Sequence, residues 1–356
     1  MRAWKKFFNK IRPTIGIDIG STSIKTVELH GNSRNLQLVS SHRRITPPDA
    51  IVDGVISNPG AVVKELNEIV EHQGWQGRQV VTAIGGRKVV IRHLKLPVMP
   101  DSELKQAVHW EAEKYLPFGK QELVLDFASL GQVGGESGKQ LLILLAIVPK
   151  EVAMGYYEVC SAAGLDLVAI DIIPLALQRA LFFAETNAQE IAVADIGAEL
   201  TTFSVISAGK VSFARTIAAA GRSINKAIAN SFNLEVAAAQ ELKEKASDVF
   251  EIKSPEMKAT EFPGLEVIIR DSLLELAQEL RRSIDFWRTQ SNGKNIAKLI
   301  LTGGTARLTG IDRLLSQELE LPVEIGHPLK HLLDSGKVLE PDFAVASGLA
   351  MRGVGD

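Results

Sequence analysis

The sequence contains very little cysteine. Cys160 is the only cysteine among 356 residues, so the chain cannot form an internal disulfide bond or a zinc site built from several thiolates. A chain without disulfides is typical of a reducing compartment, which makes the cytoplasm the expected location. The composition, with 46% hydrophobic and 23% charged residues, excludes a disordered or collagen-like chain.

Long apolar runs and an excess of positive charge are also absent. The longest uninterrupted apolar run, Leu141–Val148, is far shorter than the roughly 18 residues of a membrane-spanning helix. No apolar core of a secretory signal peptide is present at the start. Lys and Arg number 40 against 42 Asp and Glu, and five of the basic residues lie in the first 12 positions, so the remainder is acidic. Nucleic-acid binding, which depends on neutralising phosphates, is therefore not expected.

The first 13 residues form a segment of their own. Apolar residues recur there at helical spacing between the basic ones: Trp4, Phe7, Phe8 and Ile11. This pattern is typical of a helix with one apolar and one cationic face, which could lie on an anionic membrane surface through residues 1–12. A frayed terminus, or a helix that packs on its own domain, explains the pattern equally well.

Beyond Pro13, short apolar runs alternate with longer helical patterns, which indicates α/β architecture. The segment from Thr14 to Leu29 reads as strand, tight turn, strand, and Gly20 at the turn permits close approach of an anion to backbone and hydroxyl donors. Asp18 is then placed to hold a hydrated Mg²⁺, and Lys25 to reach a phosphate. The candidate binding residues are Asp18, Gly20, Ser21, Thr22, Ser23 and Lys25. Hairpins without a ligand also contain such turns.

The same device occurs a second time, 177 positions later, where Asp195 and Gly197 stand between two apolar runs and Thr201 follows. Two such turns from similar lobes could close on one phosphate chain, with Mg²⁺ held through water by Asp18 and Asp195. A third turn, Gly303-Gly304-Thr305, follows a strand over Lys298–Leu301 and would let a flat base approach the backbone. An ordinary strand-to-helix turn is the alternative for this third motif.

This order of motifs resembles the superfamily of actin, heat-shock chaperone ATPases and sugar kinases, in which a nucleotide lies between two duplicated lobes. The resemblance implies that the segments beginning at Asp18 and Asp195 are phosphate loops and that the Gly303 turn contacts adenosine. It also implies two helices that cross between the lobes, one over Ile172–Leu181 and one over Pro341–Ala350. Small residues in the second helix would allow the close packing of such a crossing.

Within this superfamily the sequence more closely resembles the PilM family of type IV pilus assembly proteins, relatives of the division protein FtsA. The matching motifs lie in the middle of the chain: Leu96-Pro97, Pro100–Leu104, Glu111–Phe118 and Val124–Phe127. The resemblance implies a two-lobed actin-like α/β fold, that is, a duplicated ribonuclease H-like fold with an inserted α+β subdomain 1C of the SHS2 type. The expected division is residues 14–80 plus 165–190 for subdomain 1A, 81–164 for 1C, 191–225 plus 296–356 for 2A, and 226–295 for 2B.

The resemblance also implies a function. It predicts a cytoplasmic scaffold, peripherally associated with the inner membrane, that binds ATP and Mg²⁺ and serves type IV pilus assembly and twitching motility. The implied partners are the N-terminal cytoplasmic peptide of a PilN-like membrane protein, held in a groove at 1A and 1C, and other platform proteins and motor ATPases of the pilus machine. Two alternatives remain: a sugar-type small-molecule kinase, and an FtsA-like division protein.

The remaining candidates concern hydrolysis and the nucleoside. Asp171 falls where actin has a glutamine, so it could position water for weak ATP hydrolysis, or it could cap the helix that follows. Lys243 and Glu244 resemble a pair in actin that contacts ribose or adenine, although a solvated charged helix face explains them equally well. Gly221, at the turn into a helix over Ser223–Asn230, is expected to face the nucleotide.

Overall fold

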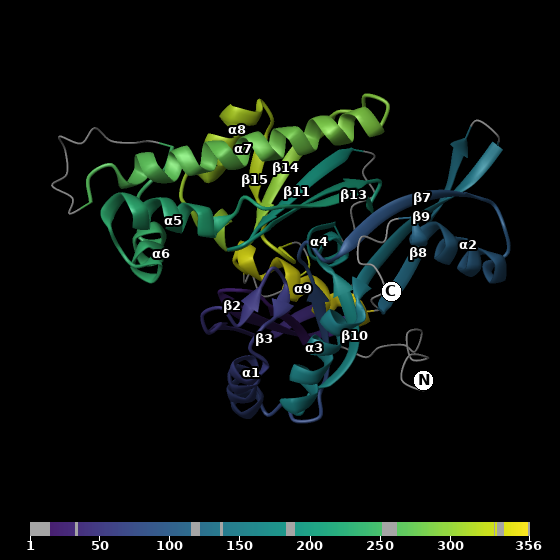
Figure 1. Cartoon of the computed structure of the whole chain (residues 1–356), viewed down its shortest axis with the longest axis horizontal. Helices are drawn as coiled ribbons and strands as arrows, with labels where there is room; N and C mark the ends of the chain where they lie inside the picture. The colour runs from purple at the N-terminus through teal and green to yellow at the C-terminus, as the bar shows by residue number, and fades with distance from the viewer. Residues whose placement is uncertain are drawn as a thin grey trace.

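The computed structural model describes residues 15–32, 35–114, 122–135, 138–182, 189–250, 262–330, 332 and 338–354. The basic segment of residues 1–13 and the last part of the Glu111–Phe118 motif lie outside these ranges. The described chain forms two lobes, each built on a five-stranded sheet, and a smaller three-stranded unit beside them (Figure 1). Of the described helices, none combines the length and the apolar character needed to cross a bilayer.

The sheet of the first lobe has the strand order β10-β6-β1-β2-β3. Its strands are β1 (Ile15–Ile19), β2 (Ser23–Asn32), β3 (Asn35–Ile45), β6 (Gln79–Ile84) and β10 (Asp166–Ile172). β1 runs antiparallel to β2 and parallel to β6. Two helices, α1 (Pro59–Gln73) and α3 (Lys150–Ala162), bury their apolar stripes in one core with β1 and β6. A short hairpin, β4 (Ile51–Val52) and β5 (Val55–Ile56), precedes α1.

The second lobe repeats this plan with the order β13-β12-β11-β14-β15. Its strands are β11 (Glu190–Ile196), β12 (Thr201–Ser207), β13 (Lys210–Ile217), β14 (Ile296–Thr302) and β15 (Val323–Ile325). Three helices share its outer core: α5 (Gly221–Phe232), α7 (Leu265–Gln290) and α8 (Ile311–Leu319). The long α7 runs along the top of Figure 1, and α6 (Val236–Glu244) lies next to α5. The equivalence of β1 with β11, and of β6 with β14, confirms a duplicated architecture.

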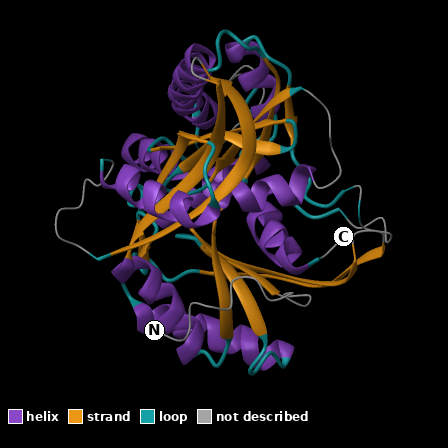
Figure 2. Ribbon diagram, turned by 90° about the vertical axis from the view of Figure 1, so that its right-hand side faces the viewer, coloured by secondary structure: helices purple, strands orange, loops and turns teal. Residues whose placement is uncertain are grey.

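Two helices lie between the two sheets, as the sequence predicts. α4 (Ile173–Phe182) follows β10 of the first lobe but contacts β12 and β13 of the second. α9 (Ala344–Ala350), preceded by the short η4 (Pro341–Phe343) and followed by η5 (Met351–Gly353), contacts β1, β2 and β6 of the first lobe. Each helix therefore packs on the sheet of the other lobe, and one apolar core joins both helices to both sheets. Figure 2 shows helices lying between and around the strands.

The crossing of α4 and α9 is close enough to require glycine. A Cβ atom added to Gly348 would lie 1.7 Å from the carbonyl oxygen of Ala176 in α4. A Cβ atom added to Gly16 in β1 would lie 2.0 Å from the carbonyl oxygen of Ala346. Backbone approaches backbone on both sides of α9, so the relative position of the lobes depends on these two residues having no side chain.

The smaller unit, called the insert below, comprises β7 (Val90–Pro97), α2 (Asp101–Glu113), β8 (Leu123–Gly135) and β9 (Gly138–Pro149). Its strand order is β7-β9-β8, and it has a hydrophobic core of its own under α2. The boundary expected at residue 81 falls inside β6, which pairs with β1 and β10 in the first lobe. Residues 80–84 are buried without alternation, as expected for a central parallel strand, so the insert sheet begins later, at Val90.

We expect Gly348→Ala to destabilise the protein. The added methyl group would overlap the Ala176 carbonyl, and relief requires α4 and α9 to separate, at a cost of about 2 kcal/mol or more. Gly60→Ala in the first turn of α1 is the matched control, because its methyl group meets only the Asn58 side chain at 3.8 Å. The midpoint of thermal unfolding should fall for Gly348→Ala alone. Equal midpoints for both variants would contradict the tight crossing.

Candidate functional site

The first predicted phosphate loop joins β1 to β2, and its turn is closed by a backbone hydrogen bond. Asp18 lies opposite Lys25 in the strand register, and the Lys25 Nζ atom is 3.3 Å from a carboxylate oxygen of Asp18. The Gly20 N–H donates to the Ser23 carbonyl at 3.1 Å, while the Thr46 hydroxyl donates to the Gly20 carbonyl at 2.7 Å. The Gly20 N–H is thus used within the turn, so donors for an anion must come from the residues between Gly20 and Lys25.

The second loop, between β11 and β12, has the same local geometry. The Gly197 N–H donates to the Leu200 carbonyl at 3.1 Å, which matches the bond made by Gly20. Asp195 accepts a hydrogen bond from the Thr302 hydroxyl at 2.9 Å. Thr201 is fully buried, and its hydroxyl donates to the Ala219 carbonyl at 2.7 Å. This hydrogen bond ties the start of β12 to the segment between β13 and α5.

Asp18 in the first lobe and Asp195 in the second lie near enough to interact electrostatically. Burial, followed by the negative charges of Asp18 and Asp342, raises the pKa of Asp195 to about 6. The Thr302 hydroxyl and the Lys25 ammonium act in the opposite direction. Within the described ranges, no group of three or more His, Cys, Asp or Glu side chains is arranged to hold a metal. The pair therefore offers two carboxylates.

A second group of predicted residues gathers beside the second loop. The Gly221 N–H and the Thr305 hydroxyl both donate to the Gly197 carbonyl, at 3.0 and 3.1 Å. A Cβ atom on Gly221 would lie 2.6 Å from the Thr305 hydroxyl and 3.2 Å from the Lys243 Nζ atom. Lys243 is only 8% exposed and donates to the Gly221 carbonyl at 3.3 Å. Burial lowers the pKa of this lysine to about 8.

The third turn packs directly against the end of β11. Gly303 has a φ of +87°, and a Cβ atom there would lie 2.5 Å from the Ile196 carbonyl oxygen, so the position requires glycine. Gly304 is exposed and begins the short η3 (Gly304–Arg307), with open space where a side chain would stand. Glu244 is also exposed and accepts a hydrogen bond from Gln240 at 3.0 Å. Lys243 and Glu244 therefore differ in exposure: the lysine is buried beside Gly221, and the glutamate is exposed.

Asp171 has a different environment from the other predicted residues. Its carboxylate pairs with Arg179 of α4 and, at 2.9 Å, with Arg352 of η5, and it accepts the Ile172 N–H at 2.8 Å. Burial alone would raise the pKa of Asp171, but the two guanidinium groups hold it below the usual range. Because Arg179 also donates to the Gly348 carbonyl at 2.8 Å, Asp171 joins β10 to both crossing helices. This arrangement favours a structural ion pair over the catalytic role considered for Asp171.

Several polar contacts between the lobes were not expected from the sequence. Glu199, in the second loop, accepts the Asp53 N–H of the β4–β5 hairpin at 2.8 Å and pairs with Arg222 at 2.8 Å. Arg43 on β3 pairs with Glu340 at 2.8 Å and with the buried Asp342 at 2.7 Å. These partners lie far apart in the sequence, so no local motif marks them.

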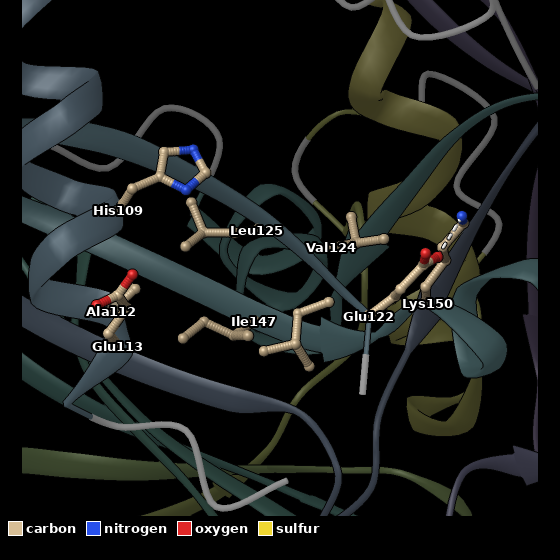
Figure 3. A pocket seen from close by; sticks show the side chains of 9 residues that line it. His109, Ala112, Glu113, Glu122, Val124, Leu125, Ile147 and Lys150 are labelled. Atoms are coloured by element: carbon tan, nitrogen blue, oxygen red, sulfur yellow. Dashed lines mark hydrogen bonds and ion pairs between the residues drawn. The ribbon is translucent and has the colours of Figure 1, made fainter. Parts of the chain in front are cut away.

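The groove expected at the insert has a counterpart in the structure. A cavity of about 610 Å³ opens between α2, the start of β8 and the end of β9. Figure 3 shows its walls, with the Glu122–Lys150 ion pair at one end. The lining residues are His109, Ala112, Glu113, Glu122, Leu123, Val124, Leu125, Ile147 and Lys150. A second cavity of about 330 Å³ shares Glu122 and Lys150 and extends onto α3 of the first lobe. The two cavities together are called the groove below.

The groove follows an open strand edge. β8 is the outermost strand of the insert sheet, and within the described residues no strand pairs with its outer edge. The Lys150 N–H donates to the Glu122 carbonyl, directly opposite, at 2.8 Å. The next pair, Leu123 and Pro149, is therefore one that makes no hydrogen bonds between the strands. In this antiparallel register Leu123 and Leu125 direct their own N–H and C=O groups away from β9. Free backbone donors and acceptors therefore border the groove.

Comparisons with known proteins identify the family. The family model of "Type IV pilus assembly protein PilM" matches residues 16–354. The structure of a PilM-PilN type IV pilus biogenesis complex is 32% identical in sequence, with a TM-score of 0.82, over 98% of this chain and 100% of that chain.

More distant structures share the fold. The ethanolamine utilization protein EutJ from Carboxydothermus hydrogenoformans is 17% identical, with a TM-score of 0.58, over 98% of this chain and 93% of that chain. MreB5 of Spiroplasma citri bound to ADP is 14% identical, with a TM-score of 0.52, over 96% of this chain and 95% of that chain. These similarities confirm the two-lobed actin-like fold. The chain belongs to the PilM family of type IV pilus assembly proteins.

Proposed function

We propose that this protein is an ATP-binding scaffold of type IV pilus assembly, which holds the cytoplasmic N-terminal peptide of a PilN-like membrane protein at the inner membrane. The observation that carries the nucleotide part is the pair of mirrored loops that bring Asp18 and Asp195 together from the two lobes. The peptide part rests on the groove along β8 and on the similarity to a PilM-PilN complex. The other pilus platform proteins and motor ATPases are proposed as further partners of this scaffold.

The residues present fit a nucleotide between the lobes. The Ser21–Ser23 segment and Lys25 offer donors for phosphates, and the tight cluster of Gly221, Lys243 and Thr305 would hold the nucleoside end. The absence of a side chain at Gly221 leaves Lys243 and Thr305 within reach of one ligand. Because Asp171 is engaged by two arginines, we assign nucleotide a structural role in closing the lobes.

The acidic pair also fits a hydrated cation. Burial and, after it, the charge of Asp18 raise the pKa of Asp195, so a cation near the two carboxylates would stabilise their charged forms. Mg²⁺ commonly keeps several water ligands and binds through one or two carboxylates together with phosphate oxygens. Asp18 and Asp195 would hold it through water, and the ion would neutralise phosphate charge when bound.

The groove fits an extended peptide that joins the insert sheet as an added strand. Leu123, Val124 and Leu125 all line the cavity although successive side chains of a strand point to opposite faces. A cavity bordered by three consecutive residues must wrap around the edge of β8. Strand addition provides main-chain hydrogen bonds at such an edge, while pockets for alternate side chains supply specificity.

We expect Asp18→Asn and Asp195→Asn each to weaken Mg-ATP binding at least about tenfold, because each change removes one of the two charges that face the cation. Isothermal titration calorimetry measures this directly. Asp285→Asn is the matched control, since Asp285 is exposed on α7 and pairs with its neighbour Arg288 at 3.5 Å. Unchanged affinity in both loop variants would remove the basis for the nucleotide site.

We expect Mg-ATP affinity to fall as the pH is lowered through about 6, because Asp195 then takes up a proton and loses its charge. Thr302→Val removes the hydrogen bond that lowers the pKa of Asp195, so this pKa should rise and the decline should begin at a higher pH. Titrations of both proteins from about pH 8 to about pH 5 compare them directly. The terminal phosphate of ATP titrates in the same range but affects both equally. Superimposable pH profiles would refute this role of Asp195.

We expect a PilN peptide to bind the β8 edge as a strand. Two versions of the peptide, each with backbone N-methyl groups on a different alternate set of residues, should differ sharply in affinity, since only one set of N–H groups faces β8. Leu125→Ala should weaken binding by about fivefold or more. Leu141→Ala on β9, a partly buried leucine of the same core that does not line the groove, is its control. Equal affinity for both methylated peptides would exclude strand addition.

A further inference from the structure

One strand pair connects the second phosphate loop with the insert. β12 begins at Thr201, directly after this loop, and its seven residues span roughly 20 Å at about 3.3 Å per residue. At its far end the chain turns at Ala208-Gly209 and returns as β13. β12 pairs with both β11 and β13 along its length, so the hairpin is held in the sheet as a stiff element of the second lobe.

The far end of this hairpin contacts the insert and the first crossing helix. The Lys210 Nζ atom donates to the Leu130 carbonyl of β8 at 2.6 Å. The Val211 carbonyl lies 3.0 Å from the His93 Nε2 atom of β7. Burial lowers the pKa of His93, so the neutral imidazole donates its Nε2 proton to this carbonyl. Gln178 of α4 donates to the Gly209 carbonyl at 2.5 Å. Figure 1 shows β13 beside β7 at this junction.

The insert contacts both lobes. It has a core of its own under α2, and Val124 of β8 and Val148 of β9 also pack against the core of the first lobe. His93 stands one residue before Leu94, which faces that core, so His93 is on the opposite face of the sheet. The sheet has only three strands, with β7 at one edge and β8, the strand of the groove, at the other. Only β9 therefore separates β7, where His93 contacts the second lobe, from β8, the strand of the groove.

We propose that the β12–β13 hairpin couples the nucleotide site to the peptide groove, with His93 and Lys210 as positioning residues that tie the insert to the second lobe. This inference rests on the proposed function. Nucleotide that draws the second loop toward the first moves the hairpin with it, and the contacts at Leu130 and Val211 move the insert and its β8 edge. Because coupling is reciprocal, bound peptide changes nucleotide affinity by the same factor.

The test measures this coupling in the full chain. Fluorescence anisotropy gives the Kd of a labelled peptide that copies the N-terminal cytoplasmic segment of the PilN-type protein from the same genome, with and without saturating Mg-AMPPNP. The parent protein should show a change of about fivefold or more. In the double variant His93→Leu/Lys210→Met the change should shrink to less than about twofold, while nucleotide affinity alone stays within about twofold of the parent.

The control variant His72→Leu/Lys64→Met makes the same two substitutions on the exposed face of α1 and should keep the parent coupling. Thermal unfolding of all three proteins confirms that each is folded. Equal coupling in the double variant and the control would overturn the inference. A parent protein that binds both ligands without any coupling would also overturn it, while leaving the proposed function intact. Failure of the parent to bind nucleotide or peptide would contradict the proposed function itself.

Discussion

The backbone contact between α4 and α9 is the constraint on which the site depends. Each helix follows the sheet of one lobe in the sequence and packs on the sheet of the other, and Gly348 lets the two helices meet at the Ala176 carbonyl. Gly16 brings β1 equally close to α9. With the lobes held this near, the charge of Asp18 at the end of β1 acts on Asp195 at the end of β11. A larger side chain at the crossing would separate the acidic residues that define the site.

The electrostatic interaction between Asp18 and Asp195 would make the arrangement of the lobes depend on a bound cation. Burial and the charge of Asp18 disfavour ionised Asp195, and the Thr302 hydroxyl and the Lys25 ammonium, which also pairs with Asp18, offset this repulsion only in part. A cation and phosphates between the loops would convert the repulsion into attraction, which favours a closed arrangement of the lobes. The hydrogen bond from the Asp53 N–H of the β4–β5 hairpin to Glu199 joins the two lobes directly. The β12–β13 hairpin extends the same response to the insert, where the peptide groove lies.

The sequence predicts the two hairpin turns that follow β1 and β11 well because their signals are local. An acid, a glycine and small polar residues within a few positions are visible in the sequence, and their repetition after 177 residues indicates duplication. The apolar runs likewise predict the central strands and the long helix that became α7. The insert boundary is less predictable, since β6 is an apolar run that either sheet could have accommodated.

Contacts between distant residues explain what the sequence could not predict. Asp171 stands before a helix, as a capping or catalytic residue would, but Arg352 reaches it from the other end of the chain. Glu199, Arg43 and Asp342 likewise have their partners in other elements. The groove could be expected from the family resemblance, but its lining residues depend on how α2 and β8 approach each other in three dimensions. These ion pairs and the groove form between residues that lie far apart in the sequence, so no local sequence pattern marks them.

The most direct test of the central claim is a crystal structure with AMPPNP and Mn²⁺ in place of Mg²⁺, recorded at a wavelength where manganese scatters anomalously. The account predicts one anomalous peak between the carboxylates of Asp18 and Asp195, connected to them through water and to the nucleotide phosphates. A nucleotide bound outside the cleft, or a metal within reach of neither carboxylate, would contradict it.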